Sequence, residues 1–184
     1  MKKIEVPNRS QVDSKAQQIF DNLEKNLGMV PNLYATIGYS SDALENFLNY
    51  SEKAGKSSFS AKEIEAIKLA VSEVNGCEYC KAAHTAIAKM NGFTEEETLN
   101  LRSGNIEDDK LKVLTQLSRE IAQNKARVDQ EYLDNFFNLG FDEKALIDLV
   151  SVIIAITFTN YIHILTQVPI DFPEAKSLSA ELVS

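Results

Sequence analysis

The 184-residue sequence has only two cysteines, no tryptophan, seven glycines and four prolines. With so little glycine and proline, and with 44% hydrophobic and 25% charged residues, the chain is typical of a folded globular protein rather than a disordered or fibrous one. Its length suits one hydrophobic core, so we expect a single domain over residues 1–184.

Positive charge and long apolar runs are also scarce. Nineteen basic residues against twenty-seven acidic ones give a formal charge of -8, which repels phosphate backbones and anionic lipid headgroups. The longest apolar run, residues 149–158, is well short of the roughly 20 residues of a membrane span, and no apolar segment follows the first lysines as in a secretory signal. We therefore expect no nucleic-acid or membrane partner and a cytoplasmic location.

Helical periodicity extends through most of the chain, and no strand-like alternation persists. A connector is expected over residues 29–40, because Pro31 resists continuing a helix. A short helix should open at the capping box of residues 94–97. Longer helices are expected at residues 11–27, 41–54, 61–75, 77–91, 109–125, 129–138 and 143–167. The pattern predicts an all-α fold.

Two of these helices have similar sequences. "FSAKEIEAIKLAVSEV" at 59–74 and "FDEKALIDLVSVIIAI" at 141–156 each contain a Phe, a cap residue, a Lys and then an apolar helix, which indicates a weakly duplicated helical unit. The second copy has no cysteine, so any thiol chemistry belongs to the first. The helix at 143–167 is apolar nearly all round and should be central. Covering it fully favours a homo-oligomer.

Both cysteines and one of the two histidines lie in "NGCEYCKAAH" at 75–84. On a helix Cys77, Cys80 and His84 fall along one stripe, and the two thiols lie near the helix start, where the dipole favours thiolate. His84 can exchange a proton near neutral pH. In a reducing cytosol such a pair is more often catalytic, redox-sensing or metal-binding than structural, and this trio could attack a substrate and close to a disulfide.

Other interpretations of the same residues stay open. The dithiol could belong to a general disulfide reductase or a redox sensor. Cys77, Cys80, His84 and His163 have the donor atoms of a structural zinc site, although three ligands from one helix would be an unusual arrangement. The chain could also be a non-catalytic helical oligomer whose cysteines are small buried hydrophobes. A c-type haem is excluded because Lys81 follows Cys80, and we expect no cofactor and no metal.

The stretch "SAKEIEAIKLAVSEVNGCEYCKAAHTAIAKMNG", residues 60–92, closely resembles the core motif of the AhpD-like alkyl hydroperoxidases of the carboxymuconolactone decarboxylase superfamily. That motif is a glutamate, eleven residues, then C-x-x-C-x-x-x-H. Residues 28–40 and 159–173 are similar to its peroxidase-related branch. The resemblance implies an AhpD-like helical bundle, trimers or hexamers, and thiol-dependent reduction of hydroperoxides in antioxidant defence.

By this resemblance Cys80 attacks the peroxide, Cys77 resolves the product, and Glu65 and His84 shuttle protons. An external dithiol must then reduce the disulfide, and in the family a lipoyl-bearing protein can do so. Tyr79 stands where some members carry a histidine, and a tyrosine is no base near neutral pH unless strongly perturbed. This departure bears on peroxidase efficiency.

Without the resemblance, the residues alone leave the choice of carboxylate, the choice of attacking thiol and the place of His163 less certain. Glu65 falls on the expected polar face of its helix, where a solvated carboxylate is the simpler interpretation, and Glu73 is the competing carboxylate nearer the thiols. The helix dipole favours Cys77 as the attacking thiol, whereas the reach of His84 favours Cys80. His163 is expected in a helix core or an interface rather than in the site.

Overall fold

The computed structural model of the chain describes residues 4–178, and this part is helical with no strand. A short 3-10 helix, η1 (Arg9–Gln11), precedes the α-helices. These are α1 (Ser14–Leu27), α2 (Asn32–Ile37), α3 (Ser41–Ala54), α4 (Ala61–Asn75), α5 (Glu78–Met90), α6 (Glu95–Ser103), α7 (Asp109–Gln123), α8 (Gln130–Asn138) and α9 (Glu143–Thr166). The predicted all-α fold is confirmed.

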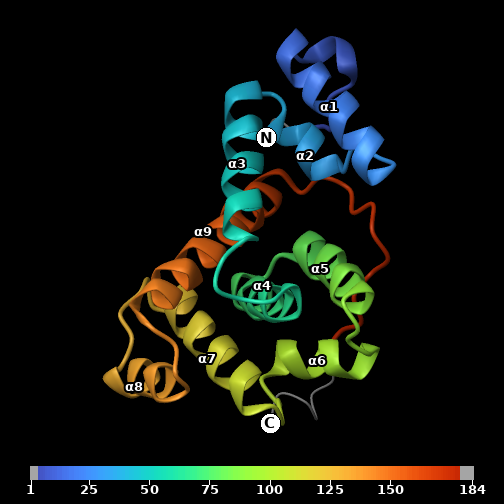
Figure 1. Cartoon of the computed structure of the whole chain (residues 1–184). Helices are drawn as coiled ribbons and strands as arrows, with labels where there is room; N and C mark the ends of the chain where they lie inside the picture. Colours follow the sequence, from blue (N-terminus) through green and yellow to red (C-terminus); the bar gives the residue numbers. More distant parts are fainter. Residues whose placement is uncertain (1–3, 179–184) are drawn as a thin grey trace.

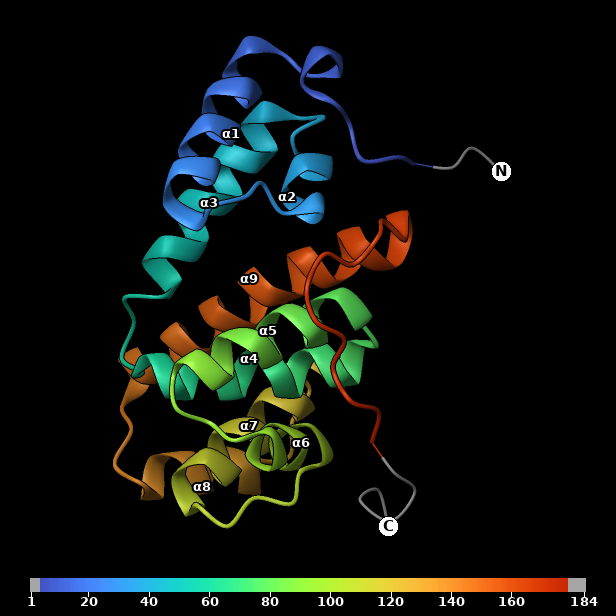
Figure 2. The ribbon, with the colours of Figure 1, turned by 90° about the vertical axis from the view of Figure 1, so that its right-hand side faces the viewer.

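The helices are stacked in tiers. Figures 1 and 2 show α1, α2 and α3 at one end, α9 with α4 and α5 in the middle, and α6, α7 and α8 at the other end. Helix α4 packs against α5, α6, α7 and α9, and it is therefore the centre of the fold. The segment after α9 returns past α5 toward the far end of the molecule (Figure 2).

Helix starts are the features that the sequence predicted best. Ser60 and Glu63 form a capping box at α4, which begins at the predicted residue, and the Glu63 carboxylate accepts from the Ser60 backbone N–H at 2.7 Å. Thr94 and Glu97 form the second box at α6. Reciprocal capping satisfies backbone donors that a helix start leaves unpaired, so these local signals fix where the helices begin.

The connector expected over residues 29–40 is wrong, because six of its residues form α2. Pro31 precedes that helix with φ of -55°, and a proline is tolerated there because the first helical turn leaves its backbone N–H groups unbonded anyway. One of those groups, the N–H of Asn32, donates to the Asp171 carboxylate at 2.7 Å. A contact across 139 residues thus stabilises the start of α2.

The polar face expected on α4 is also wrong. Glu65 and Ser72, which the helical wheel turns away from the apolar stripe, are 4% and 0% exposed. Neighbouring helices cover α4 on nearly every side, so a polar side chain on it must find a partner inside the protein. Burial changes the interpretation of Glu65 from a solvated carboxylate to a buried one.

Helix α9 is central on one face only. Residues such as Leu149, Val152 and Ile156 are buried against the other helices. The opposite face carries an exposed apolar stripe: Ile147, Val150, Ile154, Tyr161 and Leu165. By length and composition α9 alone among the described helices could cross a membrane, but its packing against α3, α4, α5 and α7 is that of a core helix.

The two similar segments meet at their starts. Phe59 and Phe141, which precede α4 and α9 at equivalent places, pack with ring centroids 5.7 Å apart. Helices α4 and α9 then lie against each other. Only α4 leads into the segment that carries the cysteines, so the chemistry is on one side of this pair.

Candidate active site

The site begins at the junction between α4 and α5. Gly76 has φ of +69°, a conformation that glycine adopts without strain, and this turn ends α4 and starts α5 within two residues. Cys77 is the N-cap of α5, and its Sγ accepts from the backbone N–H of Cys80 at 3.2 Å. The two thiols are free and buried, and they are held one helical turn apart.

The two thiols have different surroundings. Cys80 lines a pocket and its Sγ lies 3.9 Å from Thr159 Oγ1 on α9. Burial alone would raise the pKa of Cys80, but hydrogen bonds with Cys77, Asn160 and Thr159 outweigh it and lower the pKa below its usual value. Cys80 is therefore the thiol prepared to ionise.

Cys77 has the opposite electrostatic balance. Its hydrogen bond to Cys80 and its burial raise the pKa of Cys77, because Cys77 is the donor that stabilises a neighbouring thiolate. It is fully buried and is not among the residues that line the pocket. The helix dipole alone would have favoured Cys77 as the thiolate, but here it is outweighed by these local hydrogen bonds.

Glu65 and His84 form a direct pair. Glu65 Oε2 lies 2.6 Å from His84 Nδ1, and Glu65 Oε1 accepts from Lys68 Nζ at 3.1 Å. Burial alone would raise the pKa of Glu65, but the charge and hydrogen bond of His84, assisted by Lys68, lower it to about 2. The carboxylate thus stays ionised and orients the imidazole so that its other nitrogen, Nε2, is free for proton exchange.

His84 and Cys80 face the same pocket, yet no direct hydrogen bond joins them within residues 4–178. The expected side-chain contact between the two is thus replaced by a shared cavity. A bound substrate or a water molecule that lies between them can carry the proton. The geometry suits an acid–base pair that acts across a substrate.

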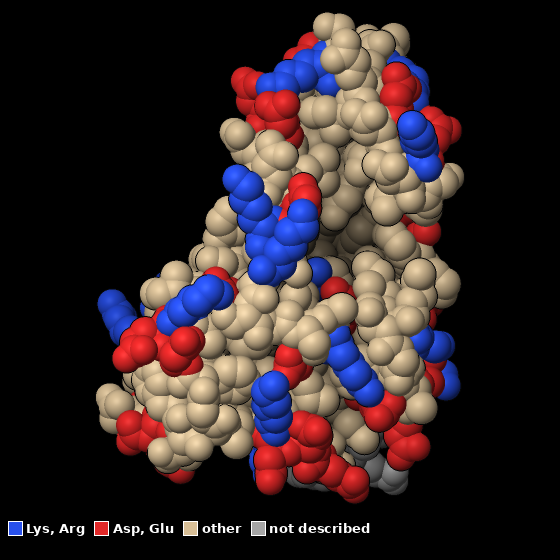
Figure 3. Space-filling model, viewed as in Figure 1, with Lys and Arg blue, Asp and Glu red and all other residues tan. Residues whose placement is uncertain are grey.

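The pocket has a volume of about 360 Å³, and its lining is mostly apolar. Leu33, Phe47, Ile156 and Phe172 are among its walls. Leu27 and Met90 also line it and are exposed, which places them at the mouth. Figure 3 shows the surface hollowed between the end formed by α1, α2 and α3 and the α5 tier, with mostly uncharged atoms around the hollow.

Tyr34 adds a hydroxyl to this apolar lining. Burial raises the pKa of Tyr34 to about 12, and the charges of Cys80 and Glu65 act in the same direction. The phenol therefore stays protonated at neutral pH and can donate a hydrogen bond to an oxygen atom in the pocket.

Tyr79 has a structural role rather than a role in proton transfer. Its hydroxyl donates to Asp171 Oδ1 at 2.5 Å and accepts from the Leu33 N–H at 3.3 Å. Burial and the Asp171 carboxylate raise the pKa of Tyr79 above its usual value, so it cannot be a base near neutral pH. Tyr79 instead ties the segment after α9 to α2, both of which supply walls of the pocket.

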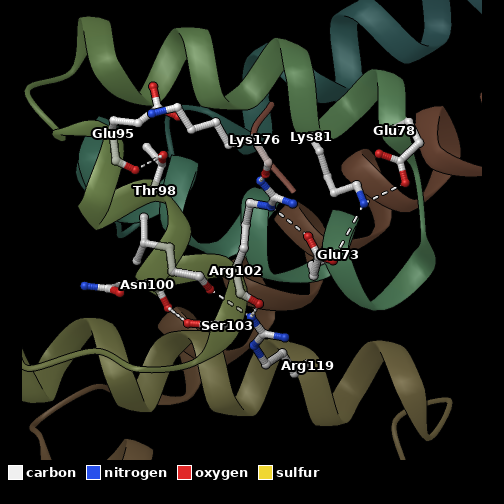
Figure 4. Close-up of polar contacts among 11 residues, drawn as sticks. Glu73, Glu78, Lys81, Glu95, Thr98, Asn100, Arg102, Ser103, Arg119 and Lys176 are labelled. Carbon is white, nitrogen blue, oxygen red and sulfur yellow. Dashed lines mark hydrogen bonds and ion pairs between the residues drawn. The ribbon is translucent and has the colours of Figure 1, made fainter. Parts of the chain in front are cut away.

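Glu73, the competing carboxylate, belongs to a separate charged cluster. Its Oε2 accepts from the buried Arg102 Nε at 2.7 Å, and its Oε1 lies 3.6 Å from Lys81 Nζ. Figure 4 shows Arg102 also reaching the backbone of Lys176, and Arg119 bonding the backbone at the end of α6. None of these residues lines the pocket, and so Glu73 has no route to the thiols.

The four residues considered as zinc ligands are not arranged around a common point. Among the described residues, no group of three or more histidine, cysteine, aspartate or glutamate side chains is arranged to hold a metal ion. His84 is engaged by Glu65, and His163 by the carbonyl of Val168 at 3.2 Å. The donor set that the sequence offers is thus divided between two sides of the dithiol.

Three polar residues of the site had no place in the sequence interpretation: Thr159, Asn160 and Asp171. Asn160 is fully buried and donates to Ser72 Oγ at 3.2 Å, while it also accepts from Asn75. Polar residues in the middle of an apolar helix were the available signal, since burial of such groups requires partners. Asp171 lies in an irregular segment, and the resemblance of residues 159–173 gave it no role.

Comparisons with known proteins identify the family of the chain. Residues 41–105, which contain Glu65, both cysteines and His84, match the carboxymuconolactone decarboxylase family. The chain is 31% identical over 112 residues to the protein YdfG of Bacillus subtilis (strain 168), a match that covers 59% of this chain and 76% of YdfG.

Two solved structures have the same fold. One is an alkylhydroperoxidase AhpD core, a peroxidase-related protein from Ralstonia eutropha JMP134, with a TM-score of 0.77, 17% identity and coverage of 97% of this chain and 92% of that one. The other is a variant of the debrominase Bmp8 in complex with 2,3,4-tribromopyrrole, with a TM-score of 0.78, 19% identity and coverage of 93% and 92%. At these identities the likeness concerns the fold alone.

Proposed function

The chain belongs to the carboxymuconolactone decarboxylase family, and we propose that it is a thiol-dependent oxidoreductase that reduces organic hydroperoxides through the Cys77–Cys80 dithiol. One observation carries the proposal above the others. The thiol whose pKa is lowered, Cys80, lines the same apolar pocket as His84, which Glu65 orients. A nucleophile, a proton carrier and a substrate space thus coincide.

The proposed reaction has two chemical steps. The Cys80 thiolate attacks the terminal oxygen of a hydroperoxide, the O–O bond breaks, and Cys80 becomes a sulfenic acid. The departing alkoxide takes a proton to become an alcohol, and His84 can deliver it while Tyr34 donates a hydrogen bond. Cys77 then attacks the Cys80 sulfur, a disulfide forms, and the sulfenic oxygen leaves as water.

The pocket favours an organic hydroperoxide over hydrogen peroxide. An apolar cavity of about 360 Å³ gains little from binding a molecule as small and polar as hydrogen peroxide, whereas an alkyl or aryl group displaces water from apolar walls. We expect a lower KM for an aryl-substituted hydroperoxide than for hydrogen peroxide.

The reductant that returns the disulfide to two thiols must have a narrow reactive group. Cys80 is 3% exposed and Cys77 is fully buried, so a thiol on the surface of a folded protein cannot approach either sulfur. A dithiol on a flexible arm, such as a lipoyl group, could enter through the pocket mouth. The same burial argues against a general reductase of protein disulfides.

The deciding experiment is a single turnover with reduced protein. Peroxide consumption and free thiols are counted together, and the proposal expects one equivalent of peroxide consumed and two thiols lost. Two thiols that persist while no peroxide is consumed would contradict it.

Single-cysteine variants test the roles of the two thiols. With an aryl hydroperoxide and a sulfenic-acid trap, Cys77→Ser should give a trapped adduct on Cys80, because the resolving thiol is missing. Cys80→Ser should consume peroxide no faster than buffer. Rapid adduct formation on Cys77 in the Cys80→Ser protein would reverse the assignment.

A second candidate reaction uses the same residues. Reductive removal of a halogen from an aromatic ring also converts a dithiol to a disulfide, with the halogen released as halide and replaced by hydrogen. The aromatic and apolar pocket walls favour this substrate class too, and the fold is similar to that of a debrominase. Halide release in the same single-turnover format, with a bromopyrrole in place of peroxide, tests it directly.

We also propose that the protein is a homo-oligomer, a trimer or a hexamer, in the cytoplasm. The exposed apolar stripe of α9 supports this, because isolated chains rarely leave so many large apolar side chains of one helix in water. A secreted location would oppose the reduced state that the dithiol cycle needs. Light scattering that gives the monomer mass of 20.5 kDa would refute the oligomer.

A further inference from the structure

His163 is a buried histidine that the proposed peroxide chemistry does not use. It is 4% exposed, and its Nε2 lies 3.2 Å from the backbone carbonyl of Val168. A carbonyl only accepts, so Nε2 carries the hydrogen and Nδ1 of the neutral ring has a free lone pair. Nδ1 is buried with no hydrogen-bond partner within residues 4–178. An unpaired buried acceptor has a free-energy cost, and so it needs an explanation.

The position of His163 on α9 places it beside the dithiol. Thr159 and Asn160, which contact Cys80, lie on α9 one turn before His163, and residues three and four apart share a helix face. The ring of His163 lies 5.3 Å from the ring of Tyr79, the residue between Cys77 and Cys80 in sequence. Helix α9 therefore presents Thr159 and Asn160 to Cys80, and His163 lies on the same face of α9 one turn further on, against Tyr79.

Cys77 is the thiol that needs a base. Its hydrogen bond to Cys80 and its burial raise the pKa of Cys77, whereas His163 and the backbone N–H of Cys80 lower it. A protonated thiol is a poor nucleophile, and Cys77 does not line the pocket that His84 faces. His84 and Glu65 thus have no access to the proton that must leave before the disulfide closes.

We propose that His163 accepts the proton of Cys77 as Cys77 attacks Cys80, so that each cysteine has its own histidine. The assignment rests on the proposed dithiol function and extends it to the resolving step. His84 works on the pocket side, where the peroxide is reduced. His163 works on the buried side, where the disulfide forms.

The proton balance is complete. As the Cys77 sulfur bonds to the Cys80 sulfur, its proton moves to His163 Nδ1, and the hydroxide that leaves the sulfenic acid takes a proton from the pocket to become water. His163 returns its extra proton when the external dithiol restores the two thiols. No oxidant other than the hydroperoxide is required.

The surroundings of His163 can tolerate a transient charge. The Tyr79 ring is close, with ring centroids 5.3 Å apart and the rings tilted by 41°, and an aromatic ring attracts a cation. Tyr79 itself is hydrogen-bonded to the Asp171 carboxylate, the acidic group on that side, and the Val168 carbonyl already accepts from Nε2. Cys77 is the titratable group that α5 presents, with Tyr79, to the imidazole.

The test separates disulfide closure from peroxide chemistry by using dithiodipyridine as the electrophile. Attack by Cys80 releases a first thiopyridone, and closure by Cys77 releases a second. Three proteins are compared by stopped-flow absorbance: wild type, His163→Gln and His163→Phe. Gln can still donate to the Val168 carbonyl but is no base, and Phe fills the ring space without a nitrogen. Melting temperatures establish that each protein is folded.

We expect the second release to be about a hundredfold slower in both variants, the usual scale for loss of a general base, while the first changes much less. If the second thiopyridone release is as fast in His163→Gln as in wild type, the role of His163 is only its hydrogen bond to the Val168 carbonyl, and the proposal is overturned. Equal slowing of both releases would also overturn it. Because no peroxide is present, a protein that fails as a peroxidase can still pass or fail this test.

Discussion

Two of the carboxylates on helix α4, Glu65 and Glu73, lie toward opposite ends of the helix and have different partners. Glu65 bonds a histidine that faces a pocket. Glu73 bonds Arg102 and lies near Lys81, in a cluster remote from the pocket lining (Figure 4). Sequence position favours Glu73 as the catalytic group because it is nearer the cysteines, but the structure pairs Glu65 with His84.

The partner decides what each carboxylate can do. An imidazole changes its protonation near neutral pH, so a carboxylate that orients one can serve proton transfer. A guanidinium keeps its charge at every physiological pH, so the pair with Arg102 can only hold structure. Four variants and one titration can test whether Glu65 serves function and Glu73 serves stability.

The largest expected effect is on stability. Glu73→Gln removes the charge that balances the buried Arg102, and breaking a buried ion pair at one partner typically costs about 3 kcal/mol or more. Urea unfolding measures the change. Glu78→Gln is the matched control, because Glu78 also binds Lys81 but is exposed, and a surface pair contributes less than about 1 kcal/mol. Equal midpoints for the two variants would contradict the structural role of Glu73.

Acid should remove the contribution of Glu65. Its pKa is about 2 in the folded protein, below the ordinary value of 4.5, so its stabilisation is complete above pH 4.5 and is lost as the pH falls through 2. A shift of this size corresponds to about 3 kcal/mol. The stability difference between wild type and Glu65→Gln should therefore shrink between these pH values in urea titrations. A difference that is constant with pH would mean that Glu65 is not ionised against His84.

The next effect is on rate. Glu65→Gln weakens the orientation of His84, and we expect about a hundredfold slower peroxide reduction, near 2.7 kcal/mol, with a higher apparent pKa of the reactive thiol. Thiolate absorbance against pH gives that pKa, and His84→Ala should change it in the same direction. Glu73→Gln, measured where it is fully folded, is the control. An effect from Glu73→Gln with none from Glu65→Gln would mean that the wrong carboxylate was chosen.

Local signals predicted most of the fold. The predicted ends of α1 and α4 and the predicted starts of α4 and α6 are confirmed, because the glycines after α1 and α4 and the capping boxes at Ser60 and Thr94 act within one turn. Helix α2 was missed because its start depends on Asp171, a residue 139 positions away. Propensity and periodicity contain no information about such a contact.

The site was predicted less evenly. The spacing of Cys77, Cys80 and His84 and the resemblance of residues 60–92 singled out four residues that the structure arranges as two pairs, Cys77 with Cys80 and Glu65 with His84. The burial of Glu65 could not be predicted, because a helical wheel assumes one wet face and α4 has none. The place of His163 beside Tyr79 depends on how α9 packs across α5, which is a property of the tertiary fold.

The smallest expected effect concerns Tyr79, which lies between the two cysteines but takes no part in either carboxylate pair. Tyr79→Phe removes the hydroxyl that bonds Asp171 and accepts from Leu33, and a hydrogen bond to a charged group contributes about 1.5 to 3 kcal/mol. Asp171 keeps its hydrogen bond to the Asn32 N–H and is only half-buried, so water can replace part of the lost hydrogen bond. We therefore expect the free energy of unfolding to fall by about 1.5 kcal/mol.

The rate of peroxide reduction should change only a few fold in Tyr79→Phe, because the raised pKa of Tyr79 excludes it as a base at neutral pH. Urea unfolding and single-turnover rates measure the two quantities, with the exposed Tyr50→Phe as the control. A drop of about a hundredfold without a loss of stability would place Tyr79 in the proton pathway with Glu65 and His84. A loss of stability with the rate preserved would place it with Glu73, among the side chains that hold the pocket walls and the helices in position.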